Sequence, residues 1–144
     1  MTDYVKLRER AMQIAIKVHS EQLDKGGKNY IYHPVRVMEN CKSDDEKIVA
    51  LLHDTIEDGD ITAEYLLMQG FPQYIVDAVL SVTRNNGENY FNFIRRCKTN
   101  PVGRKVKLAD LKDNMDITRL KELTDKDIER LRKYHKAYKM LTEK

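Results

Sequence analysis

Four side chains that can bind a metal ion or carry protons lie within the segment LLHDTIED, residues 51–58. If this segment is helical, His53, Asp54, Glu57 and Asp58 fall within an arc of roughly 140° on the helix surface. The apolar residues before and within the segment face the opposite side. One side of the predicted helix could therefore hold metal ligands or acid–base groups. An amphipathic helix with a merely acidic outer face is the alternative interpretation.

The residues just before this histidine favour the chemical interpretation. Leu51 and Leu52 directly precede His53 and Asp54, so we expect the pair to lie close to the core. A carboxylate that is partly removed from water needs a cation or several hydrogen-bond donors beside it. A bound metal ion would meet that need.

A second carboxylate is expected near the core, on the helix that follows Pro101. Apolar residues occupy two sides of this helix, and the polar stripe between them consists of Lys107, Asp110 and Asn114. A helix that is apolar on two sides is predicted to lie at the centre of a bundle. Asp110 is then either a ligand or the partner of Lys107 or Arg104 in a salt bridge.

His33, which directly precedes Pro34, completes a set of candidate ligands with His53, Asp54 and Asp110. Each histidine alone is more often a packed or capping residue, so only the set indicates a metal. Two imidazoles with carboxylates suit a divalent ion such as manganese, iron or zinc. Four protein ligands on an octahedral ion leave positions for water and for a substrate oxygen.

The elements that must position these side chains are all predicted to be helices. Apolar spacing, capping residues and prolines predict helices over residues of about 3–22, 62–68 and 72–83, and one from Ser43 through LLHDTIED. Four more helices are predicted to begin at Pro34, Tyr90, Pro101 and Thr124. The last helix has a predicted buried stripe of Ile128, Leu131, Tyr134, Tyr138 and Leu141. Strand-like alternation is nearly absent. The sequence therefore predicts an all-α helical bundle, with residues 1–144 forming one domain.

Composition excludes several classes of protein. Of the 144 residues, 41% are hydrophobic and 34% are charged, and no apolar run approaches the ~20 residues of a membrane span. We find no secretory signal, and the two cysteines make neither a disulfide framework nor a thiolate zinc site. The expected location is cytoplasmic, with no membrane partner. A net charge of +3 does not by itself indicate nucleic-acid binding and is equally compatible with an anionic small molecule.

The order of these residues, a histidine, an adjacent His-Asp pair and a later aspartate, resembles the HD superfamily of metal-dependent phosphohydrolases. The wider motifs are more specific. KGGKNYIYHP resembles the loop ahead of the first histidine in the hydrolase domain of Rel/Spo-type alarmone enzymes. ALLHDTIED resembles their HDxxED segment, and KLADLKDN resembles their KLADxxxN segment. The matches extend from about residue 11 to about residue 120, so the resemblance implies a single HD-type domain over residues 1–144.

The resemblance also implies roles for individual residues. One divalent ion, Mn²⁺ or a similar metal, would be held by His33, His53, Asp54 and Asp110. A metal-activated water would be oriented and deprotonated by the catalytic pair Glu57 and Asp58. The substrate would be contacted by Lys25, Lys107 and Asn114. Pairing with a nearby acid is an equally good role for Lys107, and packing is the favoured role for His19 and Tyr30.

In this family the reaction removes the 3′-diphosphate of guanosine tetraphosphate or pentaphosphate as pyrophosphate. The chain length resembles that of small stand-alone alarmone hydrolases with a nucleotide as their small-molecule partner. One residue departs from the pattern, because Asp24 stands where the family commonly has an arginine that packs on guanine. The alternatives are therefore the same hydrolysis of another phosphorylated nucleotide or dinucleotide cofactor, and a non-catalytic binding module. The aromatic-rich helix from Tyr90 is expected either inside the domain or against a second copy in a homo-oligomer.

Overall fold

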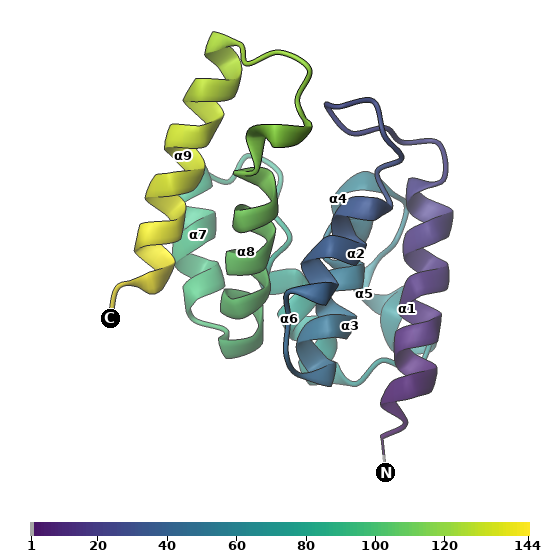
Figure 1. The fold of residues 1–144 in the computed structure, drawn as a ribbon. Coiled ribbons are helices and arrows are strands. Elements are labelled where there is room, and N and C mark those ends of the chain that lie inside the picture. Colours follow the sequence, from purple (N-terminus) through teal and green to yellow (C-terminus); the bar gives the residue numbers. More distant parts are fainter. Residues whose placement is uncertain (1) are drawn as a thin grey trace.

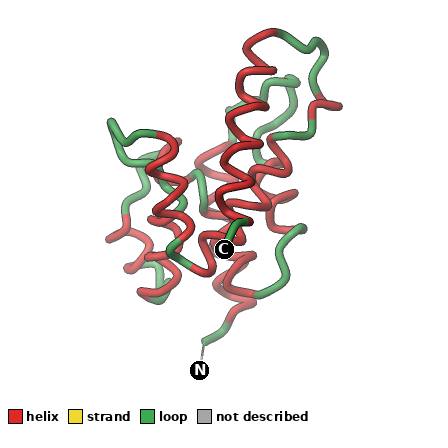
Figure 2. Tube along the Cα trace, turned by 90° about the vertical axis from the view of Figure 1, so that its left-hand side faces the viewer, coloured by secondary structure: helices red, strands yellow, loops and turns green. Residues whose placement is uncertain are grey.

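A computed structural model describes residues 2–144, and the prediction of an all-α protein is confirmed (Figures 1 and 2). The helices are α1 (Tyr4–His19), α2 (Tyr32–Glu39), α3 (Asp44–Leu52), α4 (Thr55–Asp58), α5 (Ala63–Met68), α6 (Gln73–Ser81), α7 (Tyr90–Lys98), α8 (Pro101–Asn114), the 3₁₀ helix η1 (Ile117–Arg119) and α9 (Asp125–Thr142). Within residues 2–144 the backbone forms no β-strand, only a single bridge between Leu23 and Asn29. No helix in this part of the chain has the length and apolar character needed to cross a membrane.

Most helices begin where the sequence provides a capping side chain. Asn100 accepts hydrogen bonds from the first turn of α8, with Pro101 directly after it, as predicted. Thr124 and Asp127 form the predicted capping box at the start of α9. These caps fix the positions along the chain at which the long helices start.

Helices α3 and α8 lie at the centre of the bundle. The five residues from Ile48 to Leu52 have no exposed surface. Helix α3 packs against α1, α2, α6 and α8, while α8 also contacts α7 and α9, so the prediction that α8 is central is confirmed (Figure 1). A polar residue on the facing sides of α2, α3 or α8 therefore lies deep in the molecule.

The stripe predicted for α9 is only partly buried, since Leu131, Tyr134 and Tyr138 are half-buried. Ile128 is 36% exposed, whereas Leu141, near the other end of the helix, is fully buried. The first turns of α9, where Ile128 lies in the sequence, extend beyond the end of α8 (Figure 1). Periodicity locates the inner face of a helix but does not show where along its length the neighbour ends.

Candidate functional site

His53 and Asp54 lie at a break between two helices. The prediction of one continuous helix through residues 51–58 was wrong, because α3 ends at Leu52 and α4 begins at Thr55. Two side chains explain the break: His53 Nδ1 donates to the carbonyl of Ala50 at 2.6 Å, and Thr55 Oγ1 donates to that of Leu52 at 2.8 Å. A continuing helix would use those two carbonyls for its own backbone, so the side chains replace the helical hydrogen bonds.

The break turns both side chains towards α2 and α8, and all four predicted ligands meet there. His33 Nε2 lies 3.2 Å from His53 Nε2 and 2.9 Å from Asp110 Oδ1. His53 Nε2 lies 3.1 Å from Asp54 Oδ2 and 3.3 Å from Asp110 Oδ1. His33, His53 and Asp110 are at most 4% exposed, and Asp54 is half-buried. The binding atoms of His33, His53 and Asp54 lie close enough together to hold one metal ion.

The Nδ1 atom of each of the two imidazoles already has a hydrogen-bond partner. His33 Nδ1 lies 2.6 Å from Asp113 Oδ2, and His53 Nδ1 donates to a backbone carbonyl. A carboxylate and a carbonyl can only accept, so both Nδ1 atoms carry a proton, and the Nε2 atoms, which face Asp54 and Asp110, are left to bind a metal ion or a second proton. Two lone pairs and two carboxylates directed at one point repel each other unless a cation or protons lie between them. This donor set therefore fits a divalent ion.

Asp113 and Arg36 are functional candidates that the sequence interpretation missed. Asp113 is 8% exposed, and Arg36 donates to both of its oxygens, from Nε at 2.8 Å and from Nη2 at 3.1 Å. Hydrogen bonds from His33 and Arg36 lower the pKa of Asp113 to about 2, although burial opposes this change. An acid that orients a metal-binding histidine in this way is a recurring feature of metal sites. Its signal in the sequence is its position three residues after Asp110, on the same side of the helix.

The buried charges of the cluster depend on one another. Burial would raise the pKa of Asp110, but the ammonium of Lys107 and the imidazole of His53 hold it well below its usual value. Burial would lower the pKa of His53, but Asp54 and Asp110 raise it well above its usual range. Asp110 is therefore an ionised carboxylate in the core.

Of the two roles predicted for Lys107, substrate contact and pairing with a nearby acid, the structure shows the pairing: its Nζ donates to Asp110 Oδ2 at 2.7 Å. Asn114 Nδ2 donates to the other oxygen of Asp110 at 3.1 Å. Both residues thus contact a member of the cluster, and their hydrogen bonds hold the Asp110 carboxylate in one orientation.

Glu57 and Asp58 lie on α4, one turn after Asp54, and their side chains are exposed. Glu57 Oε1 accepts a hydrogen bond from the backbone N–H of Arg84 at 2.5 Å, and Asp58 Oδ2 accepts one from Gln22 Nε2 at 3.2 Å. Surrounding protein atoms raise the pKa of both carboxyl groups by desolvation, and the charge of Asp54 raises them further. Both carboxylates are therefore better proton acceptors than they would be in water.

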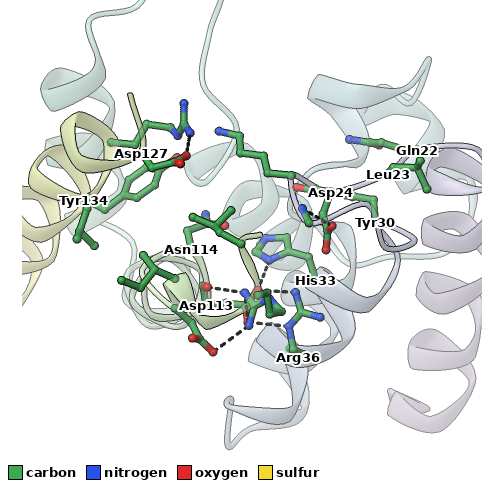
Figure 3. Close-up of a pocket in the computed structure, with 18 residues that line it drawn as sticks. Gln22, Leu23, Asp24, Tyr30, His33, Arg36, Asp113, Asn114, Asp127 and Tyr134 are labelled. Atoms are coloured by element: carbon green, nitrogen blue, oxygen red, sulfur yellow. Dashed lines mark hydrogen bonds and ion pairs between the residues drawn. The ribbon is translucent and has the colours of Figure 1, made fainter. Parts of the chain in front are cut away.

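A pocket of about 360 Å³ opens beside His33 and is bounded by the loop after α1, by α2, by η1 and by α9 (Figure 3). Lys25 and Asn114 line it, as do the basic residues Arg36, Arg119 and Arg130. Of the nine predicted site residues, only Lys25, His33 and Asn114 line this pocket.

Asp24 also lines the pocket, but its carboxylate has a structural role. Its Oδ1 accepts hydrogen bonds from the backbone N–H groups of Gly26 and Lys28, both at 2.9 Å. Gly26 packs so closely on the backbone of Arg119 that an added Cβ would lie 2.7 Å from its carbonyl oxygen. Asp24 thus fixes the loop that carries Lys25 across the pocket.

Comparison with known proteins gives relatives named either as guanosine-3′,5′-bis(diphosphate) 3′-pyrophosphohydrolases or as GTP pyrophosphokinases, although no protein-family model matches the chain. Over 119 residues it is 34% identical to guanosine-3′,5′-bis(diphosphate) 3′-pyrophosphohydrolase of Aquifex aeolicus (strain VF5), which covers 74% of this chain and 17% of that protein. Over 124 residues it is 35% identical to GTP pyrophosphokinase of Myxococcus xanthus, and this match covers 74% of this chain and 16% of that protein. The chain therefore spans about one sixth of the length of these curated relatives.

A solved structure with the same fold has a TM-score of 0.74 and 21% identity, covering 94% of this chain and 84% of that one. Its title reads "A metazoan ortholog of SpoT hydrolyzes ppGpp and plays a role in starvation responses". At this identity the match supports the fold. Together with the sequence relatives, it confirms the resemblance to the HD-type hydrolase domain of Rel/Spo-type enzymes.

Proposed function

We propose that residues 1–144 form one HD-type phosphohydrolase domain, which removes the 3′-diphosphate of guanosine tetraphosphate or pentaphosphate as pyrophosphate. The observation that carries this proposal is the convergence of His33, His53, Asp54 and Asp110 from separate parts of the bundle. The relatives support the choice of substrate, because one is named as a 3′-pyrophosphohydrolase of this nucleotide and the solved structure is titled as a ppGpp hydrolase.

In this proposal the four converging side chains hold one divalent ion, for which Mn²⁺ is well suited because it accepts both imidazole and carboxylate ligands. When bound, such an ion supplies a Lewis acid that lowers the pKa of a water molecule and neutralises phosphoryl oxygens. Lys107 and Asn114 keep Asp110 ionised and oriented. Asp113 holds the proton on His33 Nδ1 and so keeps Nε2 free to bind.

Glu57 and Asp58 accept the proton of the attacking water. Their raised pKa values make them stronger bases than ordinary carboxylates, and both lie within one turn of Asp54. The Arg84 N–H fixes Glu57 Oε1, while Oε2 has no hydrogen-bond partner among residues 2–144. Oε2 is therefore the oxygen of Glu57 that can take up a proton.

The pocket beside His33 suits a phosphorylated nucleotide. Its volume of about 360 Å³ falls in the usual range for small-molecule sites, and four basic side chains line it, from Lys25, Arg36, Arg119 and Arg130, beside four acidic ones, from Asp24, Asp113, Asp116 and Asp127. The ammonium of Lys25 lies near the guanidinium of Arg130, and partial burial together with that positive charge lowers its pKa. Each of the three arginines pairs with an acid of the lining, whereas Lys25 forms no ion pair among residues 2–144, so its ammonium is the charge best placed to bind a phosphate.

Asp24 favours a second candidate, the same hydrolysis of another phosphorylated nucleotide. A carboxylate cannot stack on a purine as a guanidinium does, and the hydrogen bonds of Asp24 to Gly26 and Lys28 hold it in the loop. The phosphate-cleaving half of the site is unaffected by this replacement. A different base, or a dinucleotide, would then occupy the pocket.

Product analysis separates these candidates. Purified protein with Mn²⁺ is offered guanosine tetraphosphate beside a panel of other phosphorylated nucleotides, and the products are resolved by ion-exchange chromatography. We expect pyrophosphate and GDP from the tetraphosphate. Cleavage of another nucleotide alone would support the second candidate, and metal binding without any cleavage would support a binding module.

A further inference from the structure

The end of α1 is connected to α4 by two side chains that the proposed reaction does not use. His19 is 1% exposed, and its Nδ1 lies 2.8 Å from Gln22 Oε1. The amide of Gln22 continues the connection, because its Nε2 donates to Asp58 Oδ2 at 3.2 Å. A buried histidine is thus connected through one amide to a residue that we place in proton transfer.

Asp58, at the end of this chain of hydrogen bonds, determines where the protons of the chain lie. A carboxylate only accepts hydrogen bonds, so the nitrogen of the Gln22 amide faces Asp58 and its oxygen faces His19. His19 Nδ1 must then carry the proton and donate to that oxygen. His19 is therefore the Nδ1–H tautomer.

The second nitrogen of His19 argues against a role in packing alone. Nε2 is buried and has no hydrogen-bond partner among residues 2–144. A buried polar atom without a partner destabilises the folded state, whereas an apolar side chain of similar size would fill the same space without that cost. What His19 provides instead is the hydrogen bond from Nδ1.

Tyr30 joins this chain to the proposed metal site. Its ring packs against His19 with centroids 4.9 Å apart, and its Oη donates to Asp54 Oδ2 at 2.5 Å. Its backbone N–H donates to the carbonyl of Gln22 at 2.8 Å. His19, Gln22 and Tyr30 thus form one packed unit that contacts both Asp54 and Asp58.

We propose that His19 and Gln22 are positioning residues for Asp58, His19 by orienting the Gln22 amide and Gln22 by holding Asp58 Oδ2. The side chain of Asp58 is exposed, so without this hydrogen bond its carboxylate would be free to rotate about χ1 and χ2. This inference rests on the proposed function, in which Asp58 accepts a proton. Loss of these hydrogen bonds lowers turnover and leaves metal binding intact.

Four variants test the proposal with guanosine tetraphosphate and Mn²⁺. Gln22→Met and His19→Leu remove the two hydrogen bonds in turn, and we expect kcat to fall about 10- to 100-fold with bound Mn²⁺ unchanged. KM should stay unchanged in His19→Leu; Gln22 itself lines the pocket, so KM is compared only in the His19 variants. His19→Asn is expected to recover most of the rate, because its Nδ2 can donate from the position of Nδ1. Gln13→Met, at an exposed position of α1, is the control. Unchanged kcat in Gln22→Met would overturn the proposal, as would His19→Asn being as slow as His19→Leu.

A second measurement needs neither substrate nor metal. Nitrogen-15 NMR of the imidazole groups in the metal-free protein reports the tautomer of His19, which we expect to be Nδ1–H in the wild type and to change in Gln22→Met. An Nε2–H tautomer in the wild type would contradict the positioning chain. If the wild-type protein fails to cleave guanosine tetraphosphate, the proposed function fails, while the tautomer still decides whether the chain exists.

Discussion

Replacing His53 with alanine is expected to abolish the stabilisation that Mn²⁺ gives to the folded protein. The side chain is 2% exposed, and its Nε2 lies between 3.1 and 3.3 Å from an atom of Asp54, Asp110 and His33. It therefore lies at the centre of the four candidate ligands. Removing it leaves three, one of which, Asp54, is only half-buried.

The size of the effect follows from mass action. An ion present at 100 times its Kd, and bound only by the folded state, stabilises that state by about 2.7 kcal/mol. Unfolding entropy of about 2.1 cal/mol/K per residue gives about 0.30 kcal/mol/K for 144 residues. Dividing the stabilisation by this entropy gives a rise of about 9 °C in the Tm of the wild type. We expect a rise near zero for His53→Ala.

Thermal unfolding followed by circular dichroism, with Mn²⁺ and with a chelator, measures this rise for each protein separately. The comparison within one protein cancels any loss of stability caused by the substitution itself. His135→Ala is the matched control, because His135 is the exposed histidine of α9 and should leave the full rise in place. If His53→Ala gained the same rise and bound one equivalent of Mn²⁺, the assignment of His53 as a ligand would be refuted.

Three further predictions concern other parts of the molecule. Glu57→Gln should retain Mn²⁺ and slow turnover by roughly 10²-fold or more, the scale of general acid–base assistance, and an unchanged kcat would remove Glu57 from the mechanism. An added Cβ at Gly103 would lie 2.0 Å from Ser81 Oγ, so Gly103→Ala should lower the free energy of unfolding by about 1–3 kcal/mol. Urea denaturation should show a smaller loss in a Ser81→Ala background, and an equal loss would exclude the clash. Hydrogen bonds from Arg96 lower the pKa of Glu88 to about 2, below its ordinary 4.5. The ionised Glu88 therefore contributes fully to the free energy of unfolding above pH 4.5, and this contribution is lost as the pH falls towards 2. The free energy of unfolding of Glu88→Gln should be about 1 kcal/mol lower than that of the wild type at pH 7 and should approach it in acid.

The parts of the fold that could be predicted are those with a local cause. Asn100 with Pro101, and Thr124 with Asp127, are start signals that act within a few residues, and α8 and α9 begin there. The two apolar sides of α8 likewise predicted its central position, because a helix buried on two sides must have neighbours on both. The histidines and aspartates of the site could be chosen because their chemistry limits what they can bind.

The residues that could not be predicted depend on contacts between distant parts of the chain. Asp113 reaches His33 across 80 residues, and Gln22 reaches Asp58 across 36. Neither residue type is distinctive, since aspartate and glutamine are common on helix surfaces and in loops. Their partners follow only from the packing of α2 on α8 and of the loop after α1 on α4.

The break after Leu52 is the reason that two adjacent residues can serve one site. On a continuous helix neighbouring side chains diverge by about 100°, so His53 and Asp54 would share a face but point in different directions. Asp54 instead has φ −107° and ψ 1°, a conformation outside the helical region, and its Oδ2 lies 3.1 Å from His53 Nε2. The hydroxyl of Thr55 and the imidazole of His53 stabilise this conformation through their bonds to backbone carbonyls. The adjacent His-Asp pair therefore shares one site here because both residues lie in the break between α3 and α4.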